Sequence, residues 1–157
     1  MFKEHSRYTK VRPMTSLASP VSSDQATLTN PAFQAYAILR SGFAVAPILF
    51  GLDKFAEVLT DHWTAYLWPG VDSALPGSAN DAMLVIGVIE IVAGILVAVA
   101  PRIGAPVVAA WLGGIIVNLL LVGGYADIAL RDFGLLLAAA ALARLAAAFP
   151  NMPVVGE

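Results

Sequence analysis

Four long apolar runs constrain this chain more than any other feature. Each run is close to the ~20 residues that a helix needs to cross a hydrocarbon layer. A soluble domain of 157 residues would not bury so much apolar surface, since 59% of the residues are hydrophobic and only 13% are charged. The sequence therefore predicts an all-α fold, a membrane-spanning, antiparallel four-helix bundle. The runs cover about residues 33–52, 82–100, 105–122 and 128–149.

The segments outside the apolar runs are polar. Residues 1–31 form a leader with four Lys or Arg and no signal-peptide pattern. We expect a flexible cytoplasmic tail, with docking on a partner as the alternative. The transmembrane domain is predicted over 32–150, followed by a short tail over 151–157.

The first link, between the first two runs, is long and aromatic. Trp63, Tyr66 and Trp68 are residue types that favour the headgroup level of a membrane. We expect a short amphipathic helix over Phe55–Leu67 that lies on the membrane. The alternative is a loop that packs against the helices outside the membrane.

The distribution of cations predicts the orientation. The leader carries four Lys or Arg, whereas the first link carries Lys54 among five acidic residues. The positive-inside rule then places both termini in the cytoplasm. We expect a multi-pass protein of a bacterial-type inner membrane.

Composition excludes several classes of function. The chain has no cysteine, which rules out disulfides, thiolate-bound metals and thiol nucleophiles. Neither His5 nor His62 lies in an apolar run, so a buried bis-histidine haem is excluded and no metal site is predicted. The net charge of −2 and the absence of a basic stripe argue against nucleic acid.

Polar residues interrupt the apolar runs in one half of the predicted bundle. Glu90 is the deepest, about eight residues or ~12 Å from the nearer end of its run. Threading antiparallel helices brings the others to the same half. The candidate residues of this polar network are Asp53, Lys54, Glu90, Asn118, Arg131 and Asp132. If two cations balance two of the carboxylates, Asp53 and Asp127 are left facing solvent.

An ionised carboxylate in hydrocarbon needs a partner, water or a proton. We expect Lys54 and Arg131 to balance Glu90 and Asp132. Asn118 can offer a donor and an acceptor to a neighbouring helix. Small residues share the polar faces and let helices approach closely. The predicted helix-packing glycines are Gly51, Gly87, Gly94, Gly114 and Gly134.

The cluster has two competing interpretations. It is either an ion-pair network that fixes helix register, or a site for a quinone headgroup, a substrate or a proton, with Glu90 as the candidate catalytic residue. A surface for a partner subunit is a third interpretation.

Two short motifs resemble the DoxX-like family of four-helix membrane proteins. The first run closes with Gly51-Leu52-Asp53-Lys54-Phe55, which is similar to the family's Gly-x-x-Lys pattern. The second carries Glu90 followed four residues later by Gly94. The resemblance covers roughly residues 35–148. It implies a small subunit of a membrane redox assembly, with quinone as the candidate ligand, although some relatives resemble cargo receptors.

Three functions follow as hypotheses. The first is a non-catalytic, quinone-adjacent subunit of a membrane redox or energy-converting complex. The second is an autonomous quinone-reactive enzyme or small-molecule or proton transporter, in which Glu90 accepts a proton and Arg131 and Lys54 bind an anion or carbonyl. The third is an assembly or scaffold factor. The expected partners are membrane lipid and either other membrane subunits or a second copy of the chain.

Overall fold

The described chain is helical. A computed structural model describes residues 30–74 and 77–149, and no strand occurs among them, so the all-α prediction is confirmed for these residues. Most of the leader, residues 1–29, and the tail, residues 150–157, lie outside the described part. The elements are α1 (Pro31–Ala56), η2 (Trp63–Tyr66), α2 (Pro69–Ala74), α3 (Ala79–Val99), α4 (Pro101–Val122) and α5 (Ala126–Ala148).

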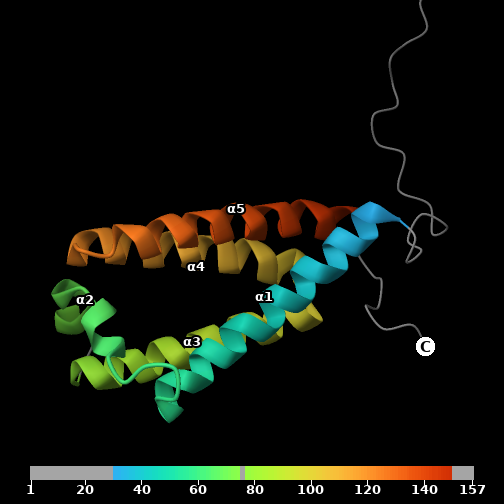
Figure 1. Ribbon diagram of the computed structural model, residues 1–157. Coiled ribbons are helices and arrows are strands. Elements are labelled where there is room, and N and C mark those ends of the chain that lie inside the picture. Colours follow the sequence, from blue (N-terminus) through green and yellow to red (C-terminus); the bar gives the residue numbers. More distant parts are fainter. Residues whose placement is uncertain (1–29, 75–76, 150–157) are drawn as a thin grey trace, which may run out of the picture.

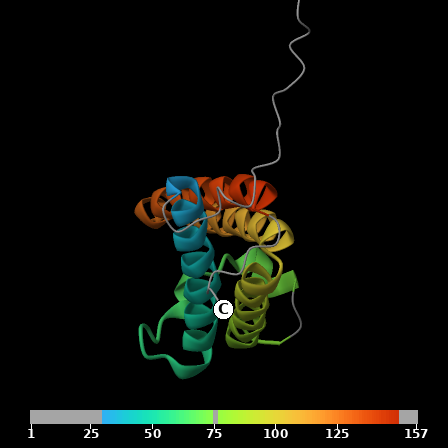
Figure 2. The ribbon, with the colours of Figure 1, turned by 90° about the vertical axis from the view of Figure 1, so that its right-hand side faces the viewer.

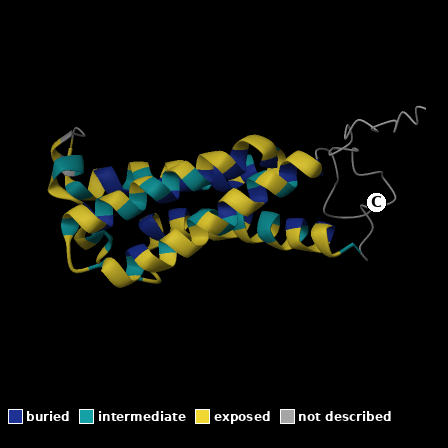
Figure 3. Ribbon diagram, turned by 90° about the horizontal axis from the view of Figure 1, so that it is seen from above, coloured by how far each residue is buried: buried dark blue, intermediate teal, exposed yellow. Residues whose placement is uncertain are grey.

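Three of the long helices, α1, α3 and α4, are each long and apolar enough to cross a membrane. Exposed residues run along their outer faces (Figure 3), and many of them are large and apolar, such as Ile38 and Val99, each 72% exposed. Such surfaces suit lipid rather than water. The chain is therefore a membrane protein. The fourth long helix, α5, is more polar because its first half carries Asp127, Arg131 and Asp132.

Local signals explain where the helices begin. Asn30 caps α1 by accepting a hydrogen bond from the Ala32 amide at 2.9 Å, and Pro31 follows at the first helical position. Ser78 and Asp81 form a capping box at the start of α3. Pro101 begins α4 after α3 ends, at the first helical position, where a proline's missing N–H leaves no helical hydrogen bond unmade.

The long helices form two pairs. Helix α1 packs along α3, and α4 packs along α5 (Figures 1 and 2). The starts of α1 and α4 and the ends of α3 and α5 lie together at what we call the terminal end. The other end, which holds η2 and α2, is the link end. Toward the link end the two pairs lie farther apart, and the link lies between them (Figure 1).

The two pairs are joined most firmly at the terminal end. The rings of Phe33, Tyr36 and Phe149 have centroids 5.7–6.1 Å apart. At the same end an arginine also bonds the two helices within each pair. Arg40 of α1 donates to the Ala98 carbonyl of α3 at 2.6 Å. Arg102 of α4 donates to two carbonyls at the end of α5. The last carbonyls of a helix lack partners within the helix, so each arginine satisfies groups that would otherwise be left unbonded.

The first link differs from the expected amphipathic helix over Phe55–Leu67. Helix α1 runs on to Ala56, and residues 57–62 are not helical. Glu57 ends the helix in the left-handed conformation, with φ of 51°. Only the short η2 follows before Leu67, which packs against Ala82 and Met83. This packing agrees with the alternative of a loop folded against the helices.

Three of the five predicted packing glycines lie where helices α1 and α3 touch. A Cβ on Gly51 would lie 2.5 Å from the Gly87 carbonyl oxygen, and one on Gly87 would lie 2.8 Å from that of Gly51. A Cβ on Gly94 would lie 2.6 Å from the Ala44 carbonyl oxygen. Gly114 and Gly134 make no such close contact within the described chain, since a Cβ there meets nothing within 4 Å. Their faces of α4 and α5 point away from the rest of the described chain.

The glycine contacts give a matched pair of variants. Gly87→Ala should destabilise the protein by about 1–3 kcal/mol, because its new methyl group meets backbone that cannot yield. Gly134→Ala should cause no loss, since the added methyl group meets no atom and alanine favours the helix. Thermal unfolding in one detergent measures both. Equal stability of the two variants would contradict the close α1–α3 approach.

Candidate functional site

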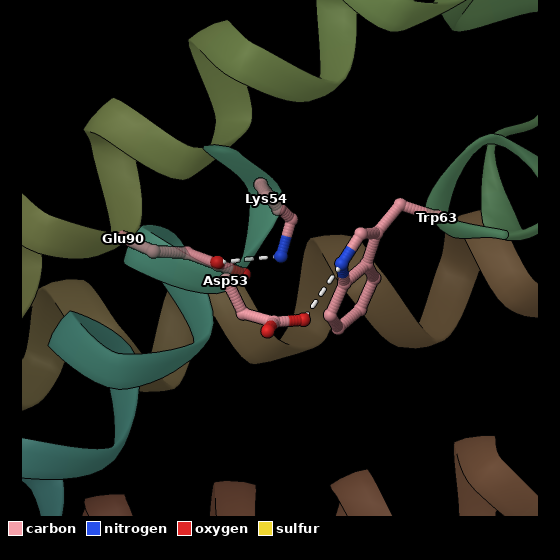
Figure 4. Close-up of polar contacts among 4 residues, drawn as sticks. All are labelled: Asp53, Lys54, Trp63 and Glu90. Carbon is pink, nitrogen blue, oxygen red and sulfur yellow. Dashed lines mark hydrogen bonds and ion pairs between the residues drawn. The ribbon is translucent and has the colours of Figure 1, made fainter. Parts of the chain in front are cut away.

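A buried ion pair joins α1 to α3. Lys54 Nζ donates to Glu90 Oε2 at 2.7 Å (Figure 4), and the two side chains are only 5% and 11% exposed. The pair lies beside the contact between Gly51 and Gly87, which allows the two helices to approach closely enough for it to form. An isolated charge in such surroundings is costly, so each member neutralises the other.

The indole of Trp63 covers this pair. Lys54 Nζ lies 4.1 Å from the centre of the Trp63 ring, within the range of a cation–π contact. The ring nitrogen donates to Asp53 Oδ2 at 3.0 Å (Figure 4). One side chain of the link therefore contacts both charged residues at the end of α1.

Asp53 is buried, contrary to the expectation that it faces solvent. It is 5% exposed. Its Oδ1 accepts hydrogen bonds from the backbone amides of Val58 and Leu59 at 2.9 and 2.8 Å. These bonds bend the chain away from the helix axis directly after α1, and they explain why no helix continues into the link. Asp127, also predicted to face solvent, is exposed.

Asn118 supplies a donor and an acceptor, but to the link rather than to a neighbouring long helix. Its Nδ2 donates to the Tyr66 carbonyl at 2.6 Å, and its Oδ1 accepts from the Trp68 amide at 2.9 Å. The Tyr66 ring also lies 5.0 Å from the Tyr125 ring at the start of α5. The link is thus tied to α4 and α5 as well as to α1.

The neighbouring residues Arg131 and Asp132 differ in how they relate to the Lys54–Glu90 bond. Arg131 is exposed and forms no ion pair with another described residue, so it does not help to neutralise Glu90. Asp132 is half-buried and near enough to act on Glu90 electrostatically. Adjacent residues on a helix point about 100° apart, so only one of this pair can face the interior.

Two tryptophans complete the surroundings of Glu90, and sequence reasoning missed both. Trp63 was interpreted only as a membrane-interface residue. Trp111 lies seven residues before Asn118, a spacing that places both on one side of α4. Its indole nitrogen is buried without a hydrogen-bond partner, although it lies close to the Glu90 carboxylate.

The described residues contain no group of three His, Cys, Asp or Glu side chains placed to hold a metal ion. Comparisons with protein-family models, with curated proteins and with solved structures found no match to this chain. Arguments about function therefore rest on the polar groups themselves.

Removing one partner of the ion pair should be far worse than removing both. Lys54→Met leaves Glu90 buried without its counter-ion and should cost about 3–5 kcal/mol of stability. The double variant Lys54→Met with Glu90→Met should recover most of this loss, because apolar side chains suit the site. Unfolding in detergent measures the cycle. Additive losses in the double variant would show that the two residues do not form a pair in solution.

Proposed function

We propose that this chain is a bundle of four antiparallel transmembrane helices, with α5 as the fourth and both termini in the cytoplasm of a bacterial-type cell. We further propose that it serves as a small, DoxX-like, non-catalytic subunit of a membrane redox or energy-converting complex. Its helices would then contribute surface and support beside a quinone-linked partner rather than the reacting groups.

The use of the buried polar groups supports this proposal. Lys54 and Glu90 bind each other, Asp53 binds Trp63 and the backbone just after α1, and Asn118 binds the link. Each of these four side chains already holds at least one bond that joins parts of the fold. Buried polar groups that bond to one another are typical of contacts that fix how helices pack.

Purification of the tagged protein from native membranes in a mild detergent tests the proposal. The expected result is the recovery of larger subunits in fixed ratio, with a visible absorption spectrum from their cofactors. Gly134→Ala tests whether a partner subunit packs against this face of α5, because its added methyl group disturbs no contact within the described chain. A homogeneous, colourless protein without partners would contradict the accessory role.

A second candidate is the autonomous quinone-reactive or proton-carrying protein, and the Trp111 indole favours it. This buried N–H makes no well-formed hydrogen bond and lies close to the Glu90 carboxylate, so a carbonyl oxygen of a bound headgroup would be a better acceptor for it. Glu90 lies beside that N–H and can accept a proton if its bond to Lys54 is released.

Binding of a short-chain benzoquinone to the purified protein distinguishes this candidate. Trp111→Phe should weaken binding by about tenfold, since one hydrogen bond is lost. Trp68→Phe is the matched control, because Trp68 reaches Asn118 only through its backbone amide. Absence of saturable binding by the wild-type protein would eliminate the candidate.

A further inference from the structure

The link is the element that closes one end of the protein. At the terminal end the two helix pairs meet directly, through the three aromatic rings and the core residues packed beside them. At the link end the pairs lie apart, with the link between them (Figure 1). Residues Trp63–Trp68 of the link contact α1, α4 and Tyr125, the residue before α5.

The two sides of the link are attached by different kinds of contact. Toward α3 the attachment is apolar, through Leu67 packed on Ala82 and Met83. Toward α4 and α5 it consists of the two Asn118 hydrogen bonds and the contact between the Tyr66 and Tyr125 rings. We call this second set of contacts the seam. Water can replace both hydrogen bonds of the seam, whereas it cannot replace the packing of Leu67.

The link covers one of the buried charges. Trp63, three residues before Tyr66, covers Lys54 Nζ. On the other helix pair, the Trp111 indole lies close to the Glu90 carboxylate and Asp132 is near enough to act on it electrostatically. Separation of the link from α4 and α5 would therefore bring water to the interior that these groups face.

We propose that Trp63–Trp68 is a gate, with Asn118 as its latch. In the closed state, which the structure shows, Asn118 holds α4 against the link and the Lys54–Glu90 pair is shielded. In the open state the latch bonds are exchanged for bonds to water, and the α4–α5 pair moves away from the link about the packed terminal end. Small polar solutes then reach the ion pair from the link end. This gate concerns access alone and holds whichever function the protein serves.

Distance measurements between two spin labels test the gate directly. Because the chain has no cysteine, Ala65→Cys and Ala126→Cys place labels on the two sides of the seam without any background. In nanodiscs the wild-type background should give mainly one short distance. Asn118→Leu should raise the ratio of open to closed molecules by about tenfold or more, as expected from losing two ordinary hydrogen bonds. Trp68→Phe, which keeps the backbone bond, should leave the distances unchanged.

Chemical labelling tests whether the opening exposes the ion pair. Acylation of Lys54 by a small amine reagent, read by peptide mass spectrometry, should be slow in the wild-type protein and faster by a similar factor in Asn118→Leu. If that variant aggregates, Tyr125→Leu, which removes the ring contact of the seam, should give a smaller change in the same direction. Unchanged distances in a folded seam variant, or rapid labelling of the wild-type protein, would overturn the gate. Neither result bears on whether partner subunits copurify.

Discussion

A carboxylate in the middle of an apolar helix must be neutralised before that helix can enter lipid. Here Lys54 neutralises Glu90 at 2.7 Å, and this requirement sets the position of α1 against α3. Lys54 lies in the last turn of α1, whereas Glu90 lies well inside α3, so their bond fixes how far one helix is shifted along the other. The backbones must also lie close together at that level. Glycine at positions 51 and 87 meets this need, since any larger residue would hold the helices apart.

The position of the first link follows from the same bond. Once the end of α1 is fixed, Asp53 beside Lys54 bends the chain by accepting two backbone amides, and it orients Trp63 through the indole nitrogen. Trp63 then covers the charge that set the register, and the backbone that follows it reaches Asn118 on α4. Neutralisation of one carboxylate thus extends, by consecutive contacts, to the attachment of the second helix pair.

The sequence predicted which residues form the helices and the polar cluster better than it predicted which residues those side chains contact. Hydropathy reports which residues avoid water, so the apolar runs and the depth of Glu90 could be read directly. It does not report which face of a helix meets another helix, which is why Gly87 packs tightly whereas Gly134, of the same residue type, does not. Asp53 was assigned to solvent because Lys54 and Arg131 were expected to balance Glu90 and Asp132, yet three donors from the link bind it. Those donors lie in a loop, and the spacing of apolar residues in a sequence does not predict the conformation of a loop.

The two ends of the protein are held by forces that respond differently to water. At the terminal end, packed rings and core residues such as Val97 and Leu142, both fully buried, join the helix pairs, and separating them would expose apolar surface. At the link end two hydrogen bonds and one ring contact join them, and water can compensate for most of what is lost there. Fluctuations of the pairs should therefore be larger at the link end. The buried charge lies toward that end, where a small motion suffices to change its access to solvent.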